Sequence, residues 1–518
     1  MTTKRSNKIL LLAFYLEKAP GIRYLANYLL KNGFEPTICF VKTSPTNPSS
    51  ISKKEKELLK ELIEKNDFLF IGLSILSSYT LSEVIKVNNM IREHYNIPVV
   101  WGGVYPSLMP EDCAKYCDIL IKGEGELALL ELANTIRNGQ DWKNIQNVCY
   151  YDENGNYHEN KLRPLVENLD EIGYPLISDK HMYLIEGNKI FNEDPQLNSN
   201  FPQNWESYEL TTTRGCPFGC SYCSSSKIRE IYKGNGKFFR FRSVDNVIKE
   251  LTEAIEKNPN IKEIRFWDEV FTTNKEWIEE FSKKYKEKIG LRFVTWGHPL
   301  LIEKETMEML VDAGLRRIIV GFQSGSPHVR NEIFKRPESN EQIIEASKIL
   351  SSFPELEVYY DLIICHILEN ISELKETFDL CMKLSAPFGL QIHGLSFLPK
   401  TDIIQTMIND GLYTEDELNN IFNAPFEENY RQWNGPRSDY YADNPEKEMW
   451  ANLIYLTQYK SIRKKLINFI KSPKKNEKRI KELKRKMENL TYEEQENAKK
   501  GKTNNNIIKN IKLIFKIR

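Results

Sequence analysis

The stretch Arg214-Gly215-Cys216-Pro217-Phe218-Gly219-Cys220-Ser221-Tyr222-Cys223 limits what this chain can be more than any other part of it. It spaces three cysteines as C-x3-C-x2-C, directly after a strand-like run at residues 208–213. Three thiolates on one tight loop can hold three corners of a [4Fe–4S] cluster and leave the fourth iron without a protein ligand. An open iron suits chemistry better than electron transfer alone, so Cys216, Cys220 and Cys223 are the expected cluster ligands.

Two other uses of the cysteines fit less well. A structural zinc site would need a fourth Cys or His close by, and the nearest histidine downstream is His298. A disulfide framework is unusual in a chain of 518 residues with nine cysteines, an odd number. The apolar run after Lys8 spans only about seven residues, too short for a signal peptide. We therefore expect a cytoplasmic protein with free thiols.

Length and charge limit the architecture further. A chain of this size allows two to four domains, and no segment approaches the roughly 18 apolar residues that a membrane span requires. The formal net charge is zero, but residues 461–518 carry 19 Lys and Arg against 6 Asp and Glu. This basic tail could contact an acidic partner, nucleic acid or an anionic membrane surface; it could equally be a solvated helical face with a frayed end.

Residues 8–138 alternate between strand-like and helix-like patterns. Such alternation predicts a doubly wound, Rossmann-like parallel sheet that binds its ligand at the carboxyl ends of the strands. The expected strands are residues 8–14, 37–41, 68–74, 98–101 and 118–121, and the expected helices are residues 21–32, 81–94 and 126–137.

The rest of the chain divides into three parts. Residues 150–207 are rich in Asn, Asp, Glu, Gly and Pro, which predicts a hairpin followed by a surface linker. Six strand–helix units follow, too few for a closed eight-stranded barrel, and they predict a partial (β/α)6 barrel. The six expected strands are residues 208–213, 261–267, 291–296, 316–321, 357–364 and 390–397. The expected domains are residues 1–149 (α/β), 150–207 (hairpin and linker), 208–400 (partial barrel) and 401–518 (helical, with the basic tail).

The cysteine spacing, with an aromatic residue before the last cysteine, resembles the cluster loop of the radical SAM (S-adenosylmethionine) enzymes. The resemblance implies that the open iron binds the amino and carboxylate groups of SAM. An electron from the cluster would then release a 5′-deoxyadenosyl radical. The resemblance also implies SAM contacts in three segments, at Tyr222, Asp268, Glu269, Gln323 and Ser324.

Two of the family's segments are altered in this chain. The family usually places a glutamate where this chain has Gln323, so a ribose hydroxyl would lose a charged acceptor and about a kcal/mol of hydrogen-bond energy. The fifth-strand segment at residues 364–370 keeps only Glu369 of a turn that contains Gly, Pro and Glu-Thr in the family. His366 in this segment could touch a ligand or pack in the interior.

The N-terminal region resembles the cobalamin-binding domain of B12-dependent radical SAM proteins, a class that includes the anaerobic magnesium-protoporphyrin ester cyclase and many carbon methyltransferases. Ser74 and Leu76 match its S-x-L element, and Gly102 and Gly103 match its G-G element. Paired glycines let backbone approach a bulky ligand. The loop at residues 13–21 lacks the histidine that many such domains place below the cobalt. The implied cobalamin contacts are Ser74, Leu76, Gly102, Gly103, Val104 and Glu124.

Together with these resemblances, the sequence predicts a cobalamin-dependent radical SAM enzyme that methylates an unactivated carbon of a biosynthetic intermediate. Its cofactors would be a [4Fe–4S] cluster, SAM and cobalamin. Its partners would be a small-molecule or peptide substrate and an electron donor such as flavodoxin or ferredoxin. One alternative is a radical cyclase or oxidoreductase without methyl transfer. Others are a binding protein with a structural or redox-sensing cluster and, for residues 8–138, a flavodoxin-like sheet with ordinary glycine turns.

Overall fold

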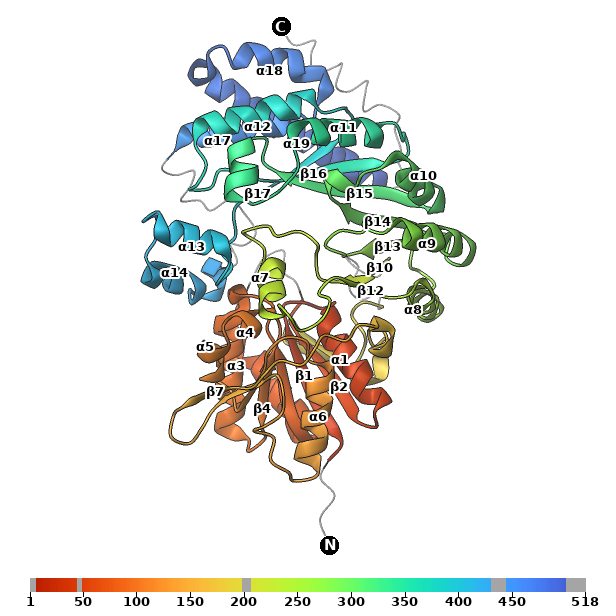
Figure 1. The fold of residues 1–518 in the computed structure, drawn as a ribbon, viewed down its shortest axis with the longest axis vertical. Helices are drawn as coiled ribbons and strands as arrows, with labels where there is room; N and C mark the ends of the chain where they lie inside the picture. The colour runs from red at the N-terminus through yellow and green to blue at the C-terminus, as the bar shows by residue number, and fades with distance from the viewer. Residues whose placement is uncertain (1–5, 44–48, 198–205, 430–443, 500–518) are drawn as a thin grey trace.

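The computed structural model describes residues 6–43, 49–197, 206–429 and 444–499 (Figure 1). Two sheets built mainly of parallel strands dominate it, and they lie one above the other in the view of Figure 1. Helix α7 (Ser224–Ile231), which follows the cysteine loop, lies between them.

The first sheet has nine strands in the order β7-β6-β5-β4-β3-β1-β2-β8-β9. Its five central strands are all parallel, and the strand order reverses beside β1 and β3. That order confirms the predicted doubly wound fold, in which ligands bind at the reversal point. The central strands are β1 (Lys8–Phe14), β2 (Glu35–Val41), β3 (Phe68–Ser74), β4 (Val99–Gly102) and β5 (Ile119–Ile121).

Helices cover both faces of this sheet, which is why its strands are apolar throughout. Alternate residues of β1 belong to different cores: Ile9 and Leu11 pack on one side, and Leu10 and Leu12 on the other. The first side holds α1 (Pro20–Lys31) and α6 (Glu126–Arg137); the second holds α2 (Lys53–Glu64), α3 (Leu81–His94) and α5 (Pro110–Ala114). The short helix α4 (Val104–Leu108) follows β4.

Helix α2 is an element that our sequence analysis missed. Ser52 and Glu55 form a reciprocal capping box at its start, each side chain accepting the other residue's backbone N–H. Leu59, Leu62 and Ile63 bury one face of the helix. The S-x-x-E pattern before these apolar residues was the available signal.

Residues 150–197 contain more regular structure than the expected hairpin and surface linker, and residues 198–205 of that expected linker lie outside the described residues. Strands β6 (Val148–Tyr151) and β7 (Tyr157–Glu159) form the expected antiparallel hairpin at one edge of the first sheet. At the other edge, β8 (Met182–Glu186) pairs in parallel with β2, and β9 (Lys189–Phe191) pairs with β8. The stretch expected as a linker therefore supplies two strands of the sheet.

The second sheet has six parallel strands in chain order, β10-β13-β14-β15-β16-β17, which confirms the predicted partial barrel. The expected first strand is divided, because β11 (Thr213–Arg214) leaves this sheet and pairs with β12 (Arg240–Phe241). The six strands are β10 (Ser207–Leu210), β13 (Glu263–Phe266), β14 (Arg292–Gly297), β15 (Leu315–Gln323), β16 (Glu357–Ile363) and β17 (Gly389–His393).

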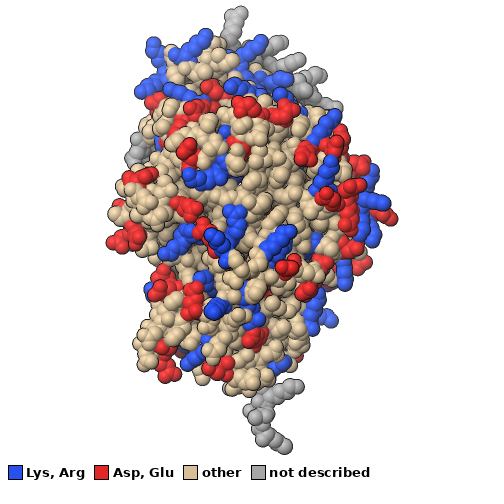
Figure 2. Space-filling view, in the orientation of Figure 1, with Lys and Arg blue, Asp and Glu red and all other residues tan. Residues whose placement is uncertain are grey.

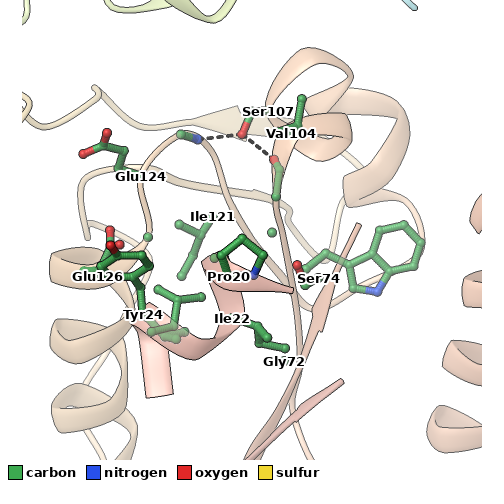
Figure 3. Close-up of a pocket in the computed structure, with 18 of the residues that line it drawn as sticks. Pro20, Ile22, Tyr24, Gly72, Ser74, Val104, Ser107, Ile121, Glu124 and Glu126 are labelled. Carbon is green, nitrogen blue, oxygen red and sulfur yellow. Dashed lines mark hydrogen bonds between the residues drawn. The ribbon is translucent and has the colours of Figure 1, made fainter. Parts of the chain in front are cut away.

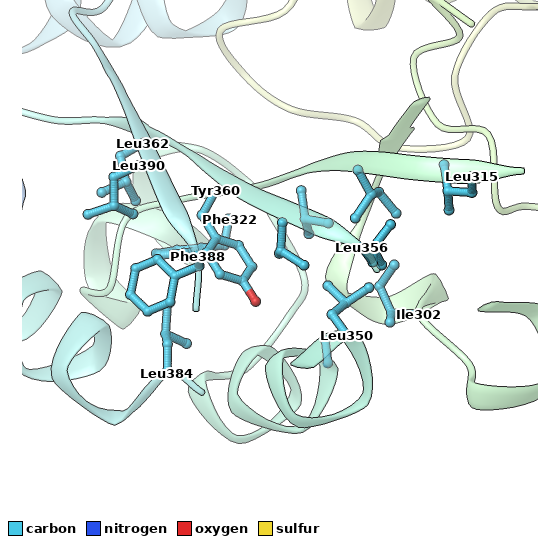
Figure 4. Packing of buried hydrophobic residues seen from close by; sticks show 14 of the residues in the cluster. Ile302, Leu315, Phe322, Leu350, Leu356, Tyr360, Leu362, Leu384, Phe388 and Leu390 are labelled. Carbon is cyan, nitrogen blue, oxygen red and sulfur yellow. The ribbon is translucent and has the colours of Figure 1, made fainter. Parts of the chain in front are cut away.

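Five helices cover one face of the second sheet, and the largest core lies between them and the strands (Figure 4). Leu315, Phe322 and Tyr360 point into this core. We call the opposite face, which carries the alternate residues of each strand, the inner face. The covering helices are α8 (Val244–Lys257), α9 (Lys275–Lys288), α10 (Lys304–Ala313), α11 (Asn340–Ser351) and α12 (Ile371–Lys383).

From residue 401 onward, the described part of the chain is helical, as expected. Lys and Arg side chains gather at the upper end of the molecule in Figure 2, where α18 and α19 lie. The end of the basic tail, residues 500–518, lies outside the described residues. None of the described helices is both long and apolar enough to cross a lipid bilayer. The helices are α13 (Asp402–Asn409), α14 (Glu415–Phe422), α17 (Pro445–Leu456), α18 (Arg463–Phe469) and α19 (Pro473–Lys499).

Candidate functional site

The cysteine loop connects β11 to helix α7, and its first turn requires glycine. Gly215 has φ of +86°, and a Cβ there would lie 2.6 Å from the carbonyl oxygen of Phe238. Cys216 and Cys223 are partly exposed, whereas Cys220 is buried. Two of the three predicted cluster ligands are therefore accessible from outside the protein.

A buried carboxylate holds the residues that lead into this loop. Oδ1 of Asp268 accepts hydrogen bonds from the backbone N–H and the hydroxyl of both Thr212 and Thr213, at 2.5–3.0 Å. Burial raises the pKa of Asp268, and these hydrogen bonds oppose the rise. We expected Asp268 to contact SAM. Asp268 has 3% of its surface exposed, and its Oδ1 positions the cysteine loop. Its Oδ2 is buried without a hydrogen-bond partner among the described residues, so the contact with SAM stays a prediction.

Glu269, the next residue, is exposed, and its charge acts on the thiols. Burial, with a contribution from Glu269, raises the pKa of Cys216 to about 11 and that of Cys223 to about 12. At neutral pH these two cysteines would therefore be thiols, and they become thiolates only when the positive charge of a bound metal lowers their pKa. No group of three or more His, Cys, Asp or Glu among the described residues is arranged to hold a single metal ion. The three cysteines need not converge on one point to hold a cubane cluster, because each of them binds a different iron.

Arg336 supports the loop from behind, and our sequence analysis did not single it out. Its guanidinium donates to Cys220 Sγ at 3.7 Å, to the Tyr222 hydroxyl at 3.3 Å and to Gly321 O at 2.6 Å. Its Nε donates to Glu338 at 2.7 Å. Tyr222, an expected SAM contact, is thus held beside the cysteines. The only sign of this role in the sequence was the pair Arg336 and Glu338, two residues apart after the fourth strand of the partial barrel.

The two residues expected to contact SAM on the fourth strand have different environments. Gln323 ends β15 with φ of +64°, and its Oε1 is buried without a hydrogen-bond partner among the described residues. Such an acceptor is available to a ligand hydroxyl. Ser324 is fully buried, and its Oγ lies 3.3 Å from Thr377 Oγ1 and accepts from Ser326 N. The Ser324 hydroxyl is thus already engaged inside the protein, and its contact with SAM stays a prediction.

The fifth strand ends in a buried polar turn. Glu369 accepts the Cys365 N–H through Oε2 at 2.6 Å, and Lys447 donates to the His366 carbonyl at 2.8 Å. His366 is fully buried, its ring centroid lies 5.2 Å from that of Phe334, and both of its ring nitrogens lack hydrogen-bond partners among the described residues. Burial lowers the pKa of His366 to about 3, with a contribution from Lys447, and raises that of Glu369 to about 8.

A cavity of about 360 Å³ lies at the carboxyl ends of the first sheet (Figure 3). Five of the six expected cobalamin contacts line it; the sixth, Leu76, does not line it and is 49% exposed. The lining residues from our expectation are Ser74, Gly102, Gly103, Val104 and Glu124. None of the described lining residues is a histidine, in keeping with the loop at residues 13–21.

A glycine turn and one serine shape this cavity. Gly103 has φ of +116°, and a Cβ there would collide with the Ile75 carbonyl. Ser107 donates to Gly103 O at 2.7 Å and accepts from Gly123 N at 2.8 Å, so it ties the ends of β4 and β5 together (Figure 3). Gly72 and Gly125 also line the space. Small residues and apolar walls fit a flat, bulky group such as part of cobalamin.

Residues of the second half of the chain form another wall of the same cavity. Thr211, Arg214, Tyr232 and Phe238 line it, and Arg214 lies two residues before the first cysteine of the loop. The carboxylate of Glu124 pairs with Arg240 and lies 3.4 Å from Arg214. Glu124 therefore lines the cavity but uses its charge to join the two halves of the protein.

Comparisons with known proteins agree with this geometry. The B12 binding domain family matches residues 9–133, and the radical SAM superfamily matches residues 210–381. The chain belongs to the B12-binding radical SAM proteins. It is a radical SAM enzyme of the class whose cofactors are a [4Fe–4S] cluster, SAM and cobalamin.

Similar curated proteins come from several organisms. An uncharacterized methyltransferase of Pyrococcus horikoshii is 28% identical over 337 residues, which cover 64% of this chain and 68% of the relative. The anaerobic magnesium-protoporphyrin IX monomethyl ester cyclase of Rubrivivax gelatinosus is 24% identical over 346 residues, covering 63% of this chain and 56% of the relative. The chain thus spans little more than half of the cyclase.

Two solved structures share the fold. The radical SAM methyltransferase TsrM from Kitasatospora setae superposes with a TM-score of 0.63 at 17% identity, covering 78% of this chain and 76% of its own. The cobalamin-dependent radical enzyme OxsB superposes with a TM-score of 0.62 at 15% identity, covering 91% and 71%. Both likenesses concern the fold alone.

Gly102 offers a direct test of the cobalamin cavity. A Cβ at Gly102 would meet only Ile121 O, at an ordinary 3.7 Å, so the backbone tolerates a side chain. We expect hydroxocobalamin binding, measured from the absorption of the protein after gel filtration, to fall from Gly102→Ala to Gly102→Val and to vanish in Gly102→Phe. The melting temperature should change little. Full binding by Gly102→Phe would place cobalamin elsewhere; variants of Gly103 are unsuitable because any Cβ disturbs the turn.

Gln323 tests the SAM site. Gln323→Leu should weaken SAM binding by about 1–2 kcal/mol, because ribose hydroxyls lose an acceptor. Gln323→Glu should preserve or modestly tighten binding through a charged acceptor. The affinities are measured by calorimetry on cluster-loaded protein without oxygen, with Gln405→Leu on α13 as the matched control. Equal affinities in all variants would remove Gln323 from the site.

Glu369 makes stability depend on pH. The folded protein keeps the Glu369 proton to about pH 8, whereas the unfolded chain releases it near 4.5. Its contribution is therefore complete below pH 4.5 and is lost as the pH rises through 8. Glu369→Gln should nearly match the parent at pH 5 and be more stable by up to about 5 kcal/mol at pH 9, since each unit of the pKa difference is worth about 1.4 kcal/mol. Thermal unfolding between these pH values measures the effect, and the exposed Glu345→Gln should show none; a gain independent of pH would contradict the assignment.

Proposed function

We propose that the protein methylates an unactivated carbon of a small-molecule or peptide substrate by radical SAM chemistry. The observation that carries the proposal is the shared cavity wall. Thr211 and Arg214, which lead into the cysteine loop, line the same cavity as Ser74 and Gly102. A methyl carrier bound there would lie next to the cluster, as transfer to a nearby carbon radical requires.

The protein's own residues bind and orient the cofactors in this proposal. A reduced [4Fe–4S] cluster supplies the electron that cleaves SAM, and cobalamin supplies a carrier for the methyl group. Asp268 holds the entry to the cysteine loop, and Arg336 holds Cys220 and Tyr222. Gln323 offers an acceptor to the ribose of SAM. An external donor such as flavodoxin or ferredoxin reduces the cluster.

The names of the relatives support methyl transfer without deciding the substrate. One relative is called a methyltransferase, and others are bacteriochlorophyllide methyltransferases of Chlorobaculum tepidum. The ester cyclase relative favours the second candidate, a radical cyclisation or oxidation on the same scaffold.

The two candidates leave different products from SAM. Protein reconstituted without oxygen, with hydroxocobalamin, SAM and dithionite, is expected to release both 5′-deoxyadenosine and S-adenosylhomocysteine, quantified by mass spectrometry. The first product reports cleavage of SAM, and the second reports donation of its methyl group. Release of 5′-deoxyadenosine alone would favour the cyclase or oxidoreductase. Release of neither would favour a non-catalytic cluster protein.

Cysteine variants test the cluster. Replacing Cys216, Cys220 and Cys223 by Ala should abolish bound iron and 5′-deoxyadenosine, because all three predicted ligands are lost. Single replacements of the buried Cys113, Cys149 and Cys381 serve as controls and should keep the iron content of the parent protein. Iron is measured colorimetrically after anoxic reconstitution. A full complement of iron in the triple variant would refute the assignment.

A further inference from the structure

Two tryptophans stack on each other at the carboxyl ends of β13 and β14. The ring centroids of Trp267 and Trp296 lie 4.3 Å apart, with 24° between the ring planes. Trp267 is 50% exposed, more than any other large hydrophobic side chain of the described residues. A large aromatic surface left in water forgoes the stabilisation that burial would give. The pair therefore has a face free to accept another ring.

This pair lies on the inner face of the second sheet. Phe266 points the other way, into the core, where its ring centroid lies 5.3 Å from that of Phe281. Side chains alternate along a strand, and Trp267 continues the hydrogen-bonding pattern of β13, because its backbone N–H donates to Leu210 O of β10 at 2.8 Å. In β14, Phe293 points into the core, and Trp296, three positions later, has the opposite orientation.

Two acceptor oxygens that accept no hydrogen bond lie on the same face and at the same end of the sheet. Asp361 on β16 pairs with Gly321 on β15, which has no side chain. Asp361 Oδ1 and Gln323 Oε1 are buried without a hydrogen-bond partner among the described residues; His393 Nε2 lies 3.6 Å from Asp361 Oδ1. Two strand spacings, about 10 Å, separate β14 from β16.

One side chain connects this face to the cluster loop. Arg336 donates to Gly321 O at 2.6 Å and to Cys220 Sγ at 3.7 Å, so one guanidinium bridges the backbone near the carboxyl end of β15 and Cys220. Glu269, whose charge acts on Cys216, follows Trp267 by two residues. A ring on the tryptophan pair would therefore lie beside the site where SAM is cleaved.

We propose that Trp267 and Trp296 bind a planar, conjugated ring of the substrate, and that Asp361 accepts a hydrogen bond from an N–H or ammonium group on the same molecule. The inference rests on the proposed function, because it assigns the pair to the substrate of that reaction. Stacking provides affinity without selecting a particular ring. The Asp361 carboxylate selects for a donor, because its Oδ1 accepts no hydrogen bond among the described residues and has only the half-exposed His393 near it, at 3.6 Å. The adenine of SAM has similar chemistry, so the test is made with the SAM site filled.

Three small probes separate the two contributions. Tryptamine has a ring and an ammonium group, indole-3-propionate has the same ring with a carboxylate, and 2-cyclohexylethylamine has the ammonium without a conjugated ring. Each is titrated by calorimetry into cobalamin- and cluster-loaded protein that is saturated with S-adenosylhomocysteine. Wild-type protein should bind tryptamine about tenfold more tightly than either of the others.

Variants assign the binding to residues. Trp267→Ala and Trp296→Ala should each weaken tryptamine binding by about tenfold, whereas Trp142→Ala, a matched change in the first half of the chain, should leave it unchanged. Asp361→Asn should remove the preference for tryptamine over indole-3-propionate. Failure of the wild-type protein to bind tryptamine, or equal binding by Trp267→Ala, would overturn the proposal.

Two further measurements separate this inference from competing explanations. The tryptamine titration is repeated with protein that holds no S-adenosylhomocysteine. Tryptamine binding in that protein but not in the saturated protein would overturn the proposal by assigning the pair to the SAM site. Release of 5′-deoxyadenosine and S-adenosylhomocysteine by the wild-type protein is measured in parallel and reports on the proposed function alone. Tryptamine binding without those products would refute the enzyme reaction and keep the ring site, and the reverse result would refute only the ring site.

Discussion

The arrangement of the two halves depends on a cluster of two arginines and two glutamates. Arg214 and Arg240 are register partners in the β11–β12 pair, so both guanidinium groups face the start of helix α6. Arg214 binds Glu126 at 2.5 Å, and Arg240 binds Glu124. Burial would raise the pKa of Glu126, but Arg214 and its hydrogen bond hold it below the ordinary value. Removing Arg214 would leave the buried Glu126 without its ion-pair partner, and the loss of one partner of a buried pair typically costs about 3–5 kcal/mol.

This cluster explains why the cavity of the first sheet lies beside the segment that leads into the cysteine loop. Doubly wound sheets bind ligands at the carboxyl ends of their strands, and so do barrels of strand–helix units. Here Ser74, at such an end of the first sheet, and Arg214, just before the cysteine loop, line one cavity. Because Arg214 also belongs to the charge cluster, an ion pair that joins the two halves simultaneously fixes the cysteine loop relative to the cavity.

Sequence patterns predicted the elements well and the roles of individual side chains less well. Strand positions such as 8–14 and 357–364 follow from local apolar runs, and the cysteine spacing lies within one loop. The function of Asp268, the burial of Ser324 and the exposure of Leu76 depend on residues that are distant in sequence. Arg336 meets Cys220 across 116 positions of the chain. Strand β8 was not predicted, because the residues around it have the composition of a loop. It is buried only because neighbouring elements cover it.

The carboxyl ends of β15 and β16 carry a strain that indicates where this chain is specialised. Gln323 and Cys365 have φ of +64° and +60°, a conformation that costs a non-glycine residue about 1–3 kcal/mol. At the second position the compensation is visible, because Glu369 accepts the Cys365 N–H and Lys447 of α17 binds the next carbonyl. Helix α17 therefore supports the end of the fifth strand. Both segments also depart from the family pattern, so the backbone strain coincides with the two segments in which this chain differs from the family.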